Sequence, residues 1–127
     1  MKVQFSGTVF SGQSEGRTYI MRSWVRRQIE EKLNFTPYPG TLNLKLTEEN
    51  AKQRSLLVKT PTLKVCASEG CCSGSLFKAS IGELDCAVVI PDIEDYPVDV
   101  LEILARTNLR EKLHLRDGDK VTVIVSV

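Results

Sequence analysis

The chain has 127 residues and a mass of 14.2 kDa, a length typical of one domain. Hydrophobic residues make up 42% and charged residues 26%, which is ordinary for a globular protein and excludes a disordered one. The net charge of +1 gives no bulk reason to expect nucleic-acid binding, and no apolar run approaches the roughly 18 residues of a membrane span. We therefore expect a single cytoplasmic domain over residues 1–127, without a membrane partner.

The first third of the chain predicts a strand, a loop and a helix. Residues 3–10 are typical of a strand, and the Gly/Ser-rich residues 11–16 predict a loop. Apolar residues then recur at helical spacing, which predicts an amphipathic helix over about 20–33 that stops at Asn34.

A rigid turn is predicted at Pro37-Tyr38-Pro39-Gly40, because proline fixes φ and glycine permits conformations closed to other residues. The strand that follows, 41–46, has leucines at alternate positions for the core, while Thr41 and Asn43 share the other face. A hydroxyl and an amide oxygen at this spacing could hold Mg²⁺, which takes few protein ligands. Taken alone, such a pair is more often only a polar outer surface, so the metal site needs support from elsewhere in the sequence.

The middle of the chain predicts further short strands. Residues 48–54 predict a turn or a short helix, and residues 56–58 begin another apolar run. Several short strands are expected over 62–90, the last of them a buried strand at 86–90 that Pro91 stops.

The last third predicts a second helix and a closing strand. Pro97 suits the first turn of a helix that runs to Leu104, and its acidic start suits the helix dipole. Asp117-Gly118 marks a tight turn before residues 121–127, which alternate as a strand. Many short strands with two helices predict a mainly-β protein, a small β-barrel with helical insertions.

Cysteine and histidine give little sign of metal chemistry. The four cysteines lack the paired spacing of a structural zinc site, so we expect free thiols, with a disulfide or a metal as the alternatives. The single histidine, His114, has no partner histidine and is expected to be structural or exposed.

Residues 7–14 match the spacing of a phosphate-binding loop except that Gln13 stands in place of the lysine. Because that motif needs the lysine on the phosphates, we do not predict a conventional phosphate loop. Backbone N–H groups of this glycine loop could still cradle a phosphate.

Three segments together resemble the archaeal CTP-dependent riboflavin kinases. They are the glycine loop 11–16, the segment 37–43, and residues 99–105 followed by Asn108-Leu109-Arg110. The resemblance covers almost the whole chain and implies a six-stranded cradle-loop (RIFT-like) β-barrel. It also implies transfer of the γ-phosphoryl group of CTP to the 5'-hydroxyl of riboflavin, giving FMN and CDP.

Roles for individual residues follow from the resemblance. Thr41 and Asn43 would hold Mg²⁺ against the CTP phosphates, and Glu102 would contact the flavin and orient its hydroxyl or accept its proton. Glu94 would lie on the flavin side as well. The nucleotide would be bound by Gly12, Gln13, Ser14, Glu15, Gly16, Arg17, Thr107, Asn108, Leu109 and Arg110.

Two positions depart from the family pattern. Ser14 stands where the family usually has glycine, and Glu94 stands where it usually has Thr or Ser. The second change is the larger, because an extra carboxylate beside bound phosphate would repel it and a hydroxyl contact to the flavin would be lost.

Two other functions compete with the kinase. One is a barrel-type transcription regulator that binds DNA through Arg22, Arg26 and Arg27; the near-neutral chain argues against nucleic acid as a partner. The other is a flavin- or nucleotide-binding protein that is a weak catalyst. The sequence does not fix the oligomeric state, for which a monomer is the expectation, or the nucleotide that serves as donor.

Overall fold

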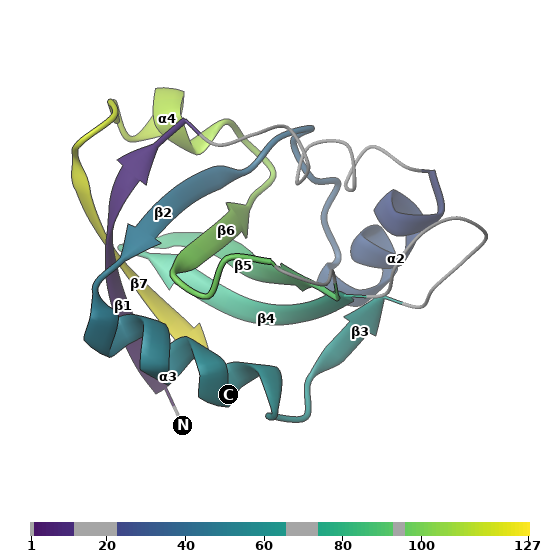
Figure 1. Ribbon diagram of the computed structural model, residues 1–127. Coiled ribbons are helices and arrows are strands. Elements are labelled where there is room, and N and C mark those ends of the chain that lie inside the picture. Colours follow the sequence, from purple (N-terminus) through teal and green to yellow (C-terminus); the bar gives the residue numbers. More distant parts are fainter. Residues whose placement is uncertain (1, 12–22, 66–73, 93–95) are drawn as a thin grey trace.

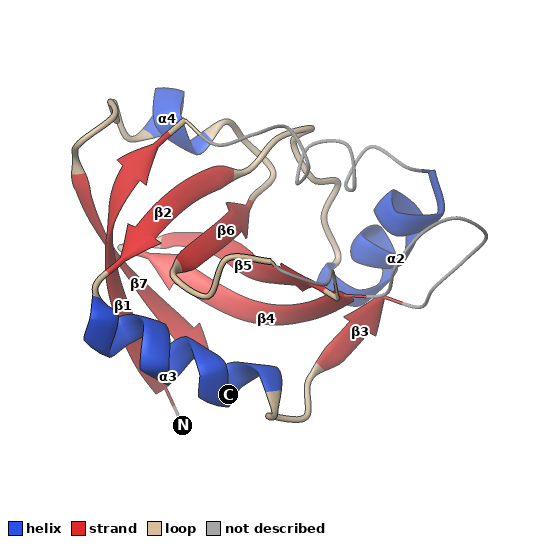
Figure 2. Ribbon diagram, viewed as in Figure 1, coloured by secondary structure: helices blue, strands red, loops and turns tan. Residues whose placement is uncertain are grey.

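The computed structural model describes residues 2–11, 23–65, 74–92 and 96–127. Strands dominate these ranges, and three helices accompany them, so the predicted mainly-β class is confirmed (Figure 2). In chain order the elements are β1 (Lys2–Phe10), α2 (Ser23–Leu33), β2 (Leu42–Leu46), α3 (Glu48–Val58), β3 (Leu63–Val65), β4 (Gly74–Ile81), β5 (Leu84–Pro91), β6 (Val100–Leu104), α4 (Leu109–Lys112) and β7 (Lys120–Ser126).

The strands form one antiparallel sheet that closes on itself. Their order is β3-β4-β5-β6-β2-β1-β7, and a further pairing of β4 with β7 joins the two sides (Figure 1). Six strands therefore make the barrel, and β3 extends it at the edge of β4. This confirms the predicted six-stranded barrel, and closure leaves few unpaired strand edges.

The barrel interior is filled by alternate residues of the strands. In β7, Val121, Val123 and Val125 are buried whereas their neighbours face outward, as the alternation predicted. Gly7 of β1 permits the close approach of β2, because a Cβ atom at this position would lie 2.9 Å from Cβ of Leu44.

Helix α2 covers the outer face of the sheet. Val25 and Ile29 are fully buried against outward-facing residues of β3, β4, β5 and β6, which form a second apolar cluster outside the barrel. The helix ends at Leu33, and Asn34 has a φ of 59°, so the predicted stop is confirmed. The predicted start at residue 20 lies outside the described residues.

The prediction for residues 48–58 was wrong in part. They form one helix, α3, capped by Thr47, whose hydroxyl accepts a hydrogen bond from the backbone N–H of Asn50 at 3.2 Å. The apolar residues at 56–58 end this helix instead of beginning a new run. Leu57 alone among them reaches the core, whereas Leu56 and Val58 are 66% and 47% exposed.

The second predicted helix, over 97–104, was also wrong. Val100–Leu104 is the strand β6, which lies between β2 and β5. All five of its residues are buried, because one face points into the barrel and the other is covered. A strand buried on both faces shows no polar–apolar alternation, so its pattern is easily read as helical.

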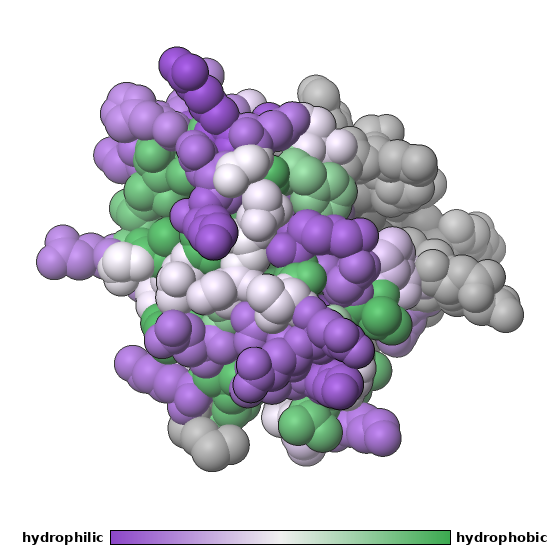
Figure 3. Space-filling model, turned by 60° about the vertical axis from the view of Figure 1, so that its left-hand side comes forward, coloured by the Kyte–Doolittle hydropathy of each residue, from purple (hydrophilic) through white to green (hydrophobic). Residues whose placement is uncertain are grey.

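Other predictions were confirmed. Gly118 has a φ of 96° in the tight turn before β7, and His114 is exposed. Cys86 is a buried free thiol, while the other three cysteines lie outside the described residues. Figure 3 shows a face on which polar side chains interrupt the apolar areas. Within the described ranges, none of the helices has the length and apolar character needed to span a membrane.

Candidate active site

The rigid turn before β2 is tied to the end of β6. The N–H of Tyr38 donates to the carbonyl oxygen of Ala105 at 2.7 Å, and the N–H of Gly40 donates to that of Tyr38 at 2.8 Å. A Cβ atom at position 40 would lie 3.3 Å from the Tyr38 ring, which explains a glycine there. The turn therefore fixes where β2 begins relative to β6.

The register of the sheet sets Asn43 beside Glu102. These two residues are cross-strand partners on β2 and β6, and Phe10 at the end of β1 is the partner of Asn43 on its other side. Since Leu42 and Ile103 belong to the interior cluster, Asn43 and Glu102 point to the outer face. The predicted glycine loop begins immediately after Phe10, beside this pair.

Thr41 joins the pair through its side chain. Its Oγ1 lies 3.2 Å from Oδ1 of Asn43 and 3.3 Å from Oε1 of Glu102. The predicted shared face of Thr41 and Asn43 is thus confirmed, and the strand that carries Glu102 brings a carboxylate to the same place. A hydroxyl has one hydrogen to donate, so Thr41 shares it between these two acceptors.

Glu102 is a buried carboxylate with defined partners. Its residue is 5% exposed, and its Oε2 accepts a hydrogen bond of 2.5 Å from the hydroxyl of Tyr96. With Thr41 on Oε1, both carboxylate oxygens have donors. Burial of a charge is costly unless it is hydrogen-bonded or paired, and these contacts offset that cost.

A cavity of about 110 Å³ lies beside this group of residues. It is lined by the turn at 38–41, the end of β6 and the start of α4, including Thr41, Asn108 and Arg110. Its volume is below the 300 Å³ or so of pockets that enclose a whole small ligand, so it matches a phosphate-sized group better than an entire nucleotide.

Asn108 organises the α4 side of the cavity. Its Oδ1 accepts hydrogen bonds from the backbone N–H groups of Arg110 and Glu111 at 3.0 and 3.3 Å, as an N-cap residue does. Its Nδ2 donates to the hydroxyl of Tyr38 at 3.2 Å. Asn108 therefore links the rigid turn to α4 across the cavity.

Arg110 provides the cation of the cavity. It forms an ion pair with Asp117, whose carboxylate also accepts hydrogen bonds from Oγ of Ser11 at 3.1 and 2.9 Å. These contacts with Ser11 and Arg110 hold the pKa of Asp117 below its ordinary value. Among the described residues, Nε of Arg110 has no hydrogen-bond partner although it is buried, so the guanidinium retains a donor for a ligand.

The oxygen atoms at the β2–β6 edge fit a small hard cation. Ligands at the 2.0–2.1 Å typical of octahedral Mg²⁺ lie about 3 Å apart when they occupy adjacent positions. The 3.2 Å between Oγ1 of Thr41 and Oδ1 of Asn43 is close to this value. When both oxygens bind a cation, the hydroxyl hydrogen of Thr41 can still be donated to Glu102.

No cluster of three or more His, Cys, Asp or Glu suited to a metal occurs in the part of the chain that the structure describes. Two neutral oxygens such as those of Thr41 and Asn43 suit a cation that takes its remaining ligands from phosphate and water.

The sequence predictions fall into two groups. Thr41, Asn43 and Glu102 lie together, and residues 107–110 line the same cavity as Thr41. The other predicted residues lie outside the described ranges: Gly12, Gln13, Ser14, Glu15, Gly16, Arg17 and Glu94.

Sequence reasoning missed Tyr96, Asp117 and Arg54. Tyr96 binds Glu102, Asp117 binds Arg110, and Arg54 of α3 lies over the Tyr96 ring. Of these three, Arg54 is the residue whose burial could have been predicted from the sequence. It precedes Leu57 by three residues, so a helix that buries Leu57 carries Arg54 on the same face.

Comparison with known proteins gives a match over most of the chain. The family model CTP-dep_RFKase, described as "Domain of unknown function DUF120", matches residues 9–125. This range includes the β2–β6 edge, the cavity and the residues that the structure leaves undescribed between β1 and α2.

Several curated archaeal proteins named riboflavin kinase are similar to the chain. Identity is 39% over 128 residues with the protein of Methanosarcina barkeri, which covers 95% of this chain and 56% of the relative. It is 41% over 128 residues for Pyrobaculum aerophilum (95% and 60%) and 38% over 127 residues for Ignicoccus hospitalis (97% and 71%). The chain thus spans little more than half the length of the Methanosarcina relative.

Proposed function

The chain belongs to the CTP-dependent riboflavin kinase family, and from this premise we propose that it is a phosphotransferase that phosphorylates riboflavin at its 5'-hydroxyl with CTP as donor. The products are FMN and CDP. The observation that carries the proposal is the group of Thr41, Asn43 and Glu102, in which the Thr41 hydroxyl lies within hydrogen-bond distance of both the amide oxygen of Asn43 and the buried carboxylate of Glu102.

Thr41 and Asn43 would hold Mg²⁺ on the outer face of β2, beside the cavity. When bound, the ion neutralises phosphate charge as it develops during transfer. Glu102 would orient Thr41 by accepting its hydroxyl hydrogen, which leaves the oxygen lone pairs for the ion. Glu102 would therefore both support the metal ligand and offer a carboxylate to the reacting groups.

Glu102 would also position the acceptor alcohol. In the transfer, a bond forms between the 5'-oxygen of riboflavin and the γ-phosphorus, and the bond from that phosphorus to the β,γ-bridging oxygen breaks. The hydroxyl proton passes to Glu102, and CDP leaves with the bridging oxygen. Phosphoryl transfer depends mainly on positioning and electrostatic stabilisation, so a fixed carboxylate at this edge is the group required.

Residues 107–110 would bind the donor nucleotide. Arg110, held beside the cavity by Asp117, has the donors and charge for a phosphate oxygen, and Asn108 keeps the Tyr38 side of the cavity in place. Residues 12–17 of the glycine loop are expected to complete the nucleotide site, and Glu94 to lie on the flavin side.

The family match favours the kinase over the DNA-binding alternative. That alternative depended on Arg22, Arg26 and Arg27. Arg22 lies outside the described residues, and Nε of Arg26 lies 3.4 Å from Oε1 of Glu30 on the same helix. Another pair of opposite charges lies where β2 meets the start of β6: Nζ of Lys45 is 2.8 Å from Oδ2 of Asp99. Lys45 and Asp99 neutralise each other at this contact, so we assign this pair a structural role.

The test is FMN formation by the purified chain with riboflavin and Mg²⁺, run in parallel with CTP, ATP, GTP and UTP. We expect FMN preferentially from CTP, and activity that depends on the divalent cation. Folded protein that forms no FMN from any nucleotide would refute the proposed activity, whereas binding of riboflavin and CDP without turnover would identify a weak catalyst. Replacement of Glu94 by Thr would then be the first change to make.

A further inference from the structure

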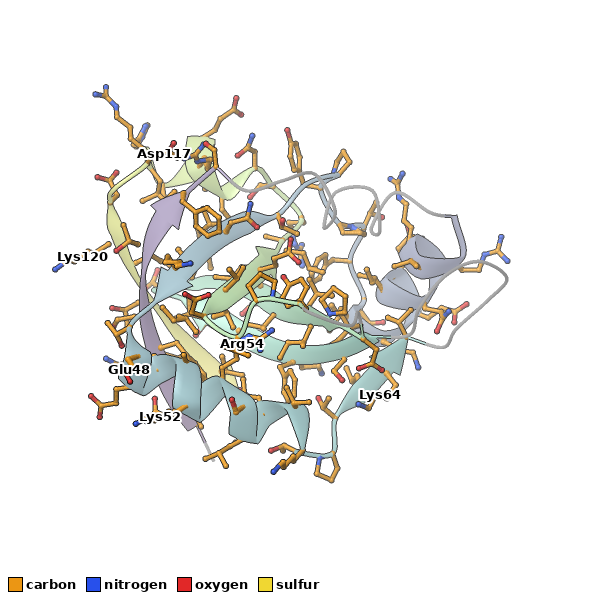
Figure 4. All side chains as sticks on the ribbon, in the orientation of Figure 1. Glu48, Lys52, Arg54, Lys64, Asp117 and Lys120 are labelled. Atoms are coloured by element: carbon orange, nitrogen blue, oxygen red, sulfur yellow. The ribbon has the colours of Figure 1, made fainter. Side chains whose placement is uncertain are left out.

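Arg54 occupies an unusual position for an arginine. It lies on the buried face of α3 and is 4% exposed, while Glu48 and Lys52 of the same helix point away from the barrel (Figure 4). Within the described residues its Nε has no hydrogen-bond partner. Burial of a guanidinium is destabilising unless its charge is compensated, so a negative group nearby would stabilise this arginine.

The groups that face Arg54 come from β6 and from the turn before it. Its guanidinium carbon lies 5.3 Å from the centre of the Tyr96 ring, a distance typical of a cation–π contact. Burial lowers the pKa of Arg54, and Tyr96, Glu102 and Asp99 oppose this effect. Asp99 forms an ion pair with Lys45, whereas Glu102 is buried and hydrogen-bonded to Tyr96, so we take Glu102 as the carboxylate that balances Arg54.

A connected series of contacts runs from α3 to the predicted metal ligands. Arg54 lies over the Tyr96 ring, Tyr96 donates to Oε2 of Glu102 at 2.5 Å, and Oε1 of Glu102 accepts from Thr41 at 3.3 Å. Tyr96 therefore occupies one carboxylate oxygen and leaves the other facing Thr41 and Asn43. A carboxylate held at both oxygens cannot rotate freely.

We propose that Arg54 and Tyr96 are positioning residues for Glu102. Tyr96 fixes the carboxylate by its hydroxyl, and Arg54 fixes the Tyr96 ring and balances the buried negative charge. This inference rests on the proposed function, in which Glu102 receives the hydroxyl of riboflavin. It extends that function to two residues for which the resemblance gives no role, and it assigns α3 a part in the flavin side of the site.

The proposal separates the two substrates. Thr107 to Arg110, which are expected to bind the nucleotide, line the cavity, whereas neither Arg54 nor Tyr96 does. Loss of the Tyr96 hydroxyl or of the Arg54 charge should therefore impair use of riboflavin and leave the KM for CTP unchanged. Outer hydrogen-bond partners of this kind typically affect activity by about 10- to 100-fold.

The kinetic test uses Tyr96→Phe, Arg54→Met and Arg54→Lys, with Arg27→Met on the exposed face of α2 as the matched control. We expect Tyr96→Phe and Arg54→Met to lower kcat/KM for riboflavin by about tenfold, with the KM for CTP within about twofold of wild type. Arg54→Lys should recover part of the loss because it keeps the charge. Equal losses for both substrates, or no loss, would overturn the proposal.

A second test does not depend on activity. Urea unfolding of Arg54→Met, Glu102→Gln and the double variant forms a double-mutant cycle. If Arg54 balances Glu102, the double variant should lose less stability than the sum of the single losses, by about tenfold in the unfolding equilibrium constant. Additive losses would overturn the proposal even if the chain is an active kinase. If the cycle shows coupling between Arg54 and Glu102 but the chain forms no FMN, the proposed function is rejected while the interaction between Arg54 and Glu102 stands.

Discussion

Replacement of Thr41 by valine removes one oxygen atom and nearly preserves the shape of the side chain. The Thr41 hydroxyl lies 3.2 Å from Oδ1 of Asn43 and 3.3 Å from Oε1 of Glu102. A hydrogen bond to a charged group contributes about 1.5–3 kcal/mol, and the long contact to Glu102 argues for the lower end. That value corresponds to about tenfold, and loss of a metal ligand adds to it. We therefore expect Thr41→Val to raise the Mg²⁺ concentration for half-maximal activity at least about tenfold.

The assay is FMN formation as a function of Mg²⁺ concentration for wild type, Thr41→Val and Thr41→Ser. The serine variant keeps the hydroxyl, so it should retain most of the response to Mg²⁺. Thr122→Val on the outer face of β7 is the matched control and should behave as wild type. If Thr41→Val had the same kcat and the same Mg²⁺ midpoint as wild type, the assignment of Thr41 as a metal ligand would be refuted.

Three further predictions follow from single contacts. Glu102→Gln should lower kcat by about 100-fold or more, as loss of a general base does, while Glu83→Gln in the β4–β5 turn should not; equal rates for the two variants would exclude Glu102 as the base. Because contacts with Ser11 and Arg110 depress the pKa of Asp117, its ion pair should stabilise the fold above the ordinary carboxylate pKa and lose that contribution as the pH falls through the folded-state value. Urea midpoints of wild type and Asp117→Asn should therefore differ near pH 7 and converge once the pH falls below the lowered pKa of Asp117, and a constant difference would contradict the ion pair. Burial raises the pKa of the Cys86 thiol to about 12, so peptide mapping after brief alkylation at about pH 8 should find Cys86 unmodified in folded protein and modified in urea.

Strands with one covered face were the most predictable part of the fold. In β2 and β7, apolar residues alternate with polar ones, because one face fills the barrel and the other meets solvent. The same alternation placed Thr41 and Asn43 on one face, which the contact between their side chains confirms. The local sequence carries this information because side-chain direction in a strand depends only on position.

The parts that failed depend on tertiary surroundings. β6 lies between β2 and β5 with apolar contacts on both faces, so its sequence has no period that separates a strand from a helix. α3 buries Leu57 but leaves Leu56 exposed, so its run of apolar residues does not represent a core segment. The partners of Glu102 come from separate elements, Tyr96 before β6 and Arg54 on α3, and no short-range pattern connects them.

The sequence predicted Glu102 on a helix, whereas the structure places it on the strand β6. This difference changes which contacts fix the position of its carboxylate. On a strand, its distance from Asn43 is set by the backbone ladder, which places directly opposed Cβ atoms about 4.5–5.5 Å apart. Two contacts pin the start of β6 in this register: the N–H of Leu46 donates to the carbonyl oxygen of Asp99 at 2.7 Å, and Lys45 pairs with the Asp99 carboxylate.

A slip of one residue between β2 and β6 would reverse the facing of every side chain on β6. Glu102 would then point into the barrel and Ile103 would face Thr41 and Asn43, so the cost of the slip is a buried charge in an apolar interior. The charge of Glu102 thus disfavours the slip and favours the register that the proposed function requires. Leu101 and Ile103 fill the barrel interior, and this packing turns Glu102, which lies between them, to the outer face. The same packing therefore stabilises the core and places the carboxylate.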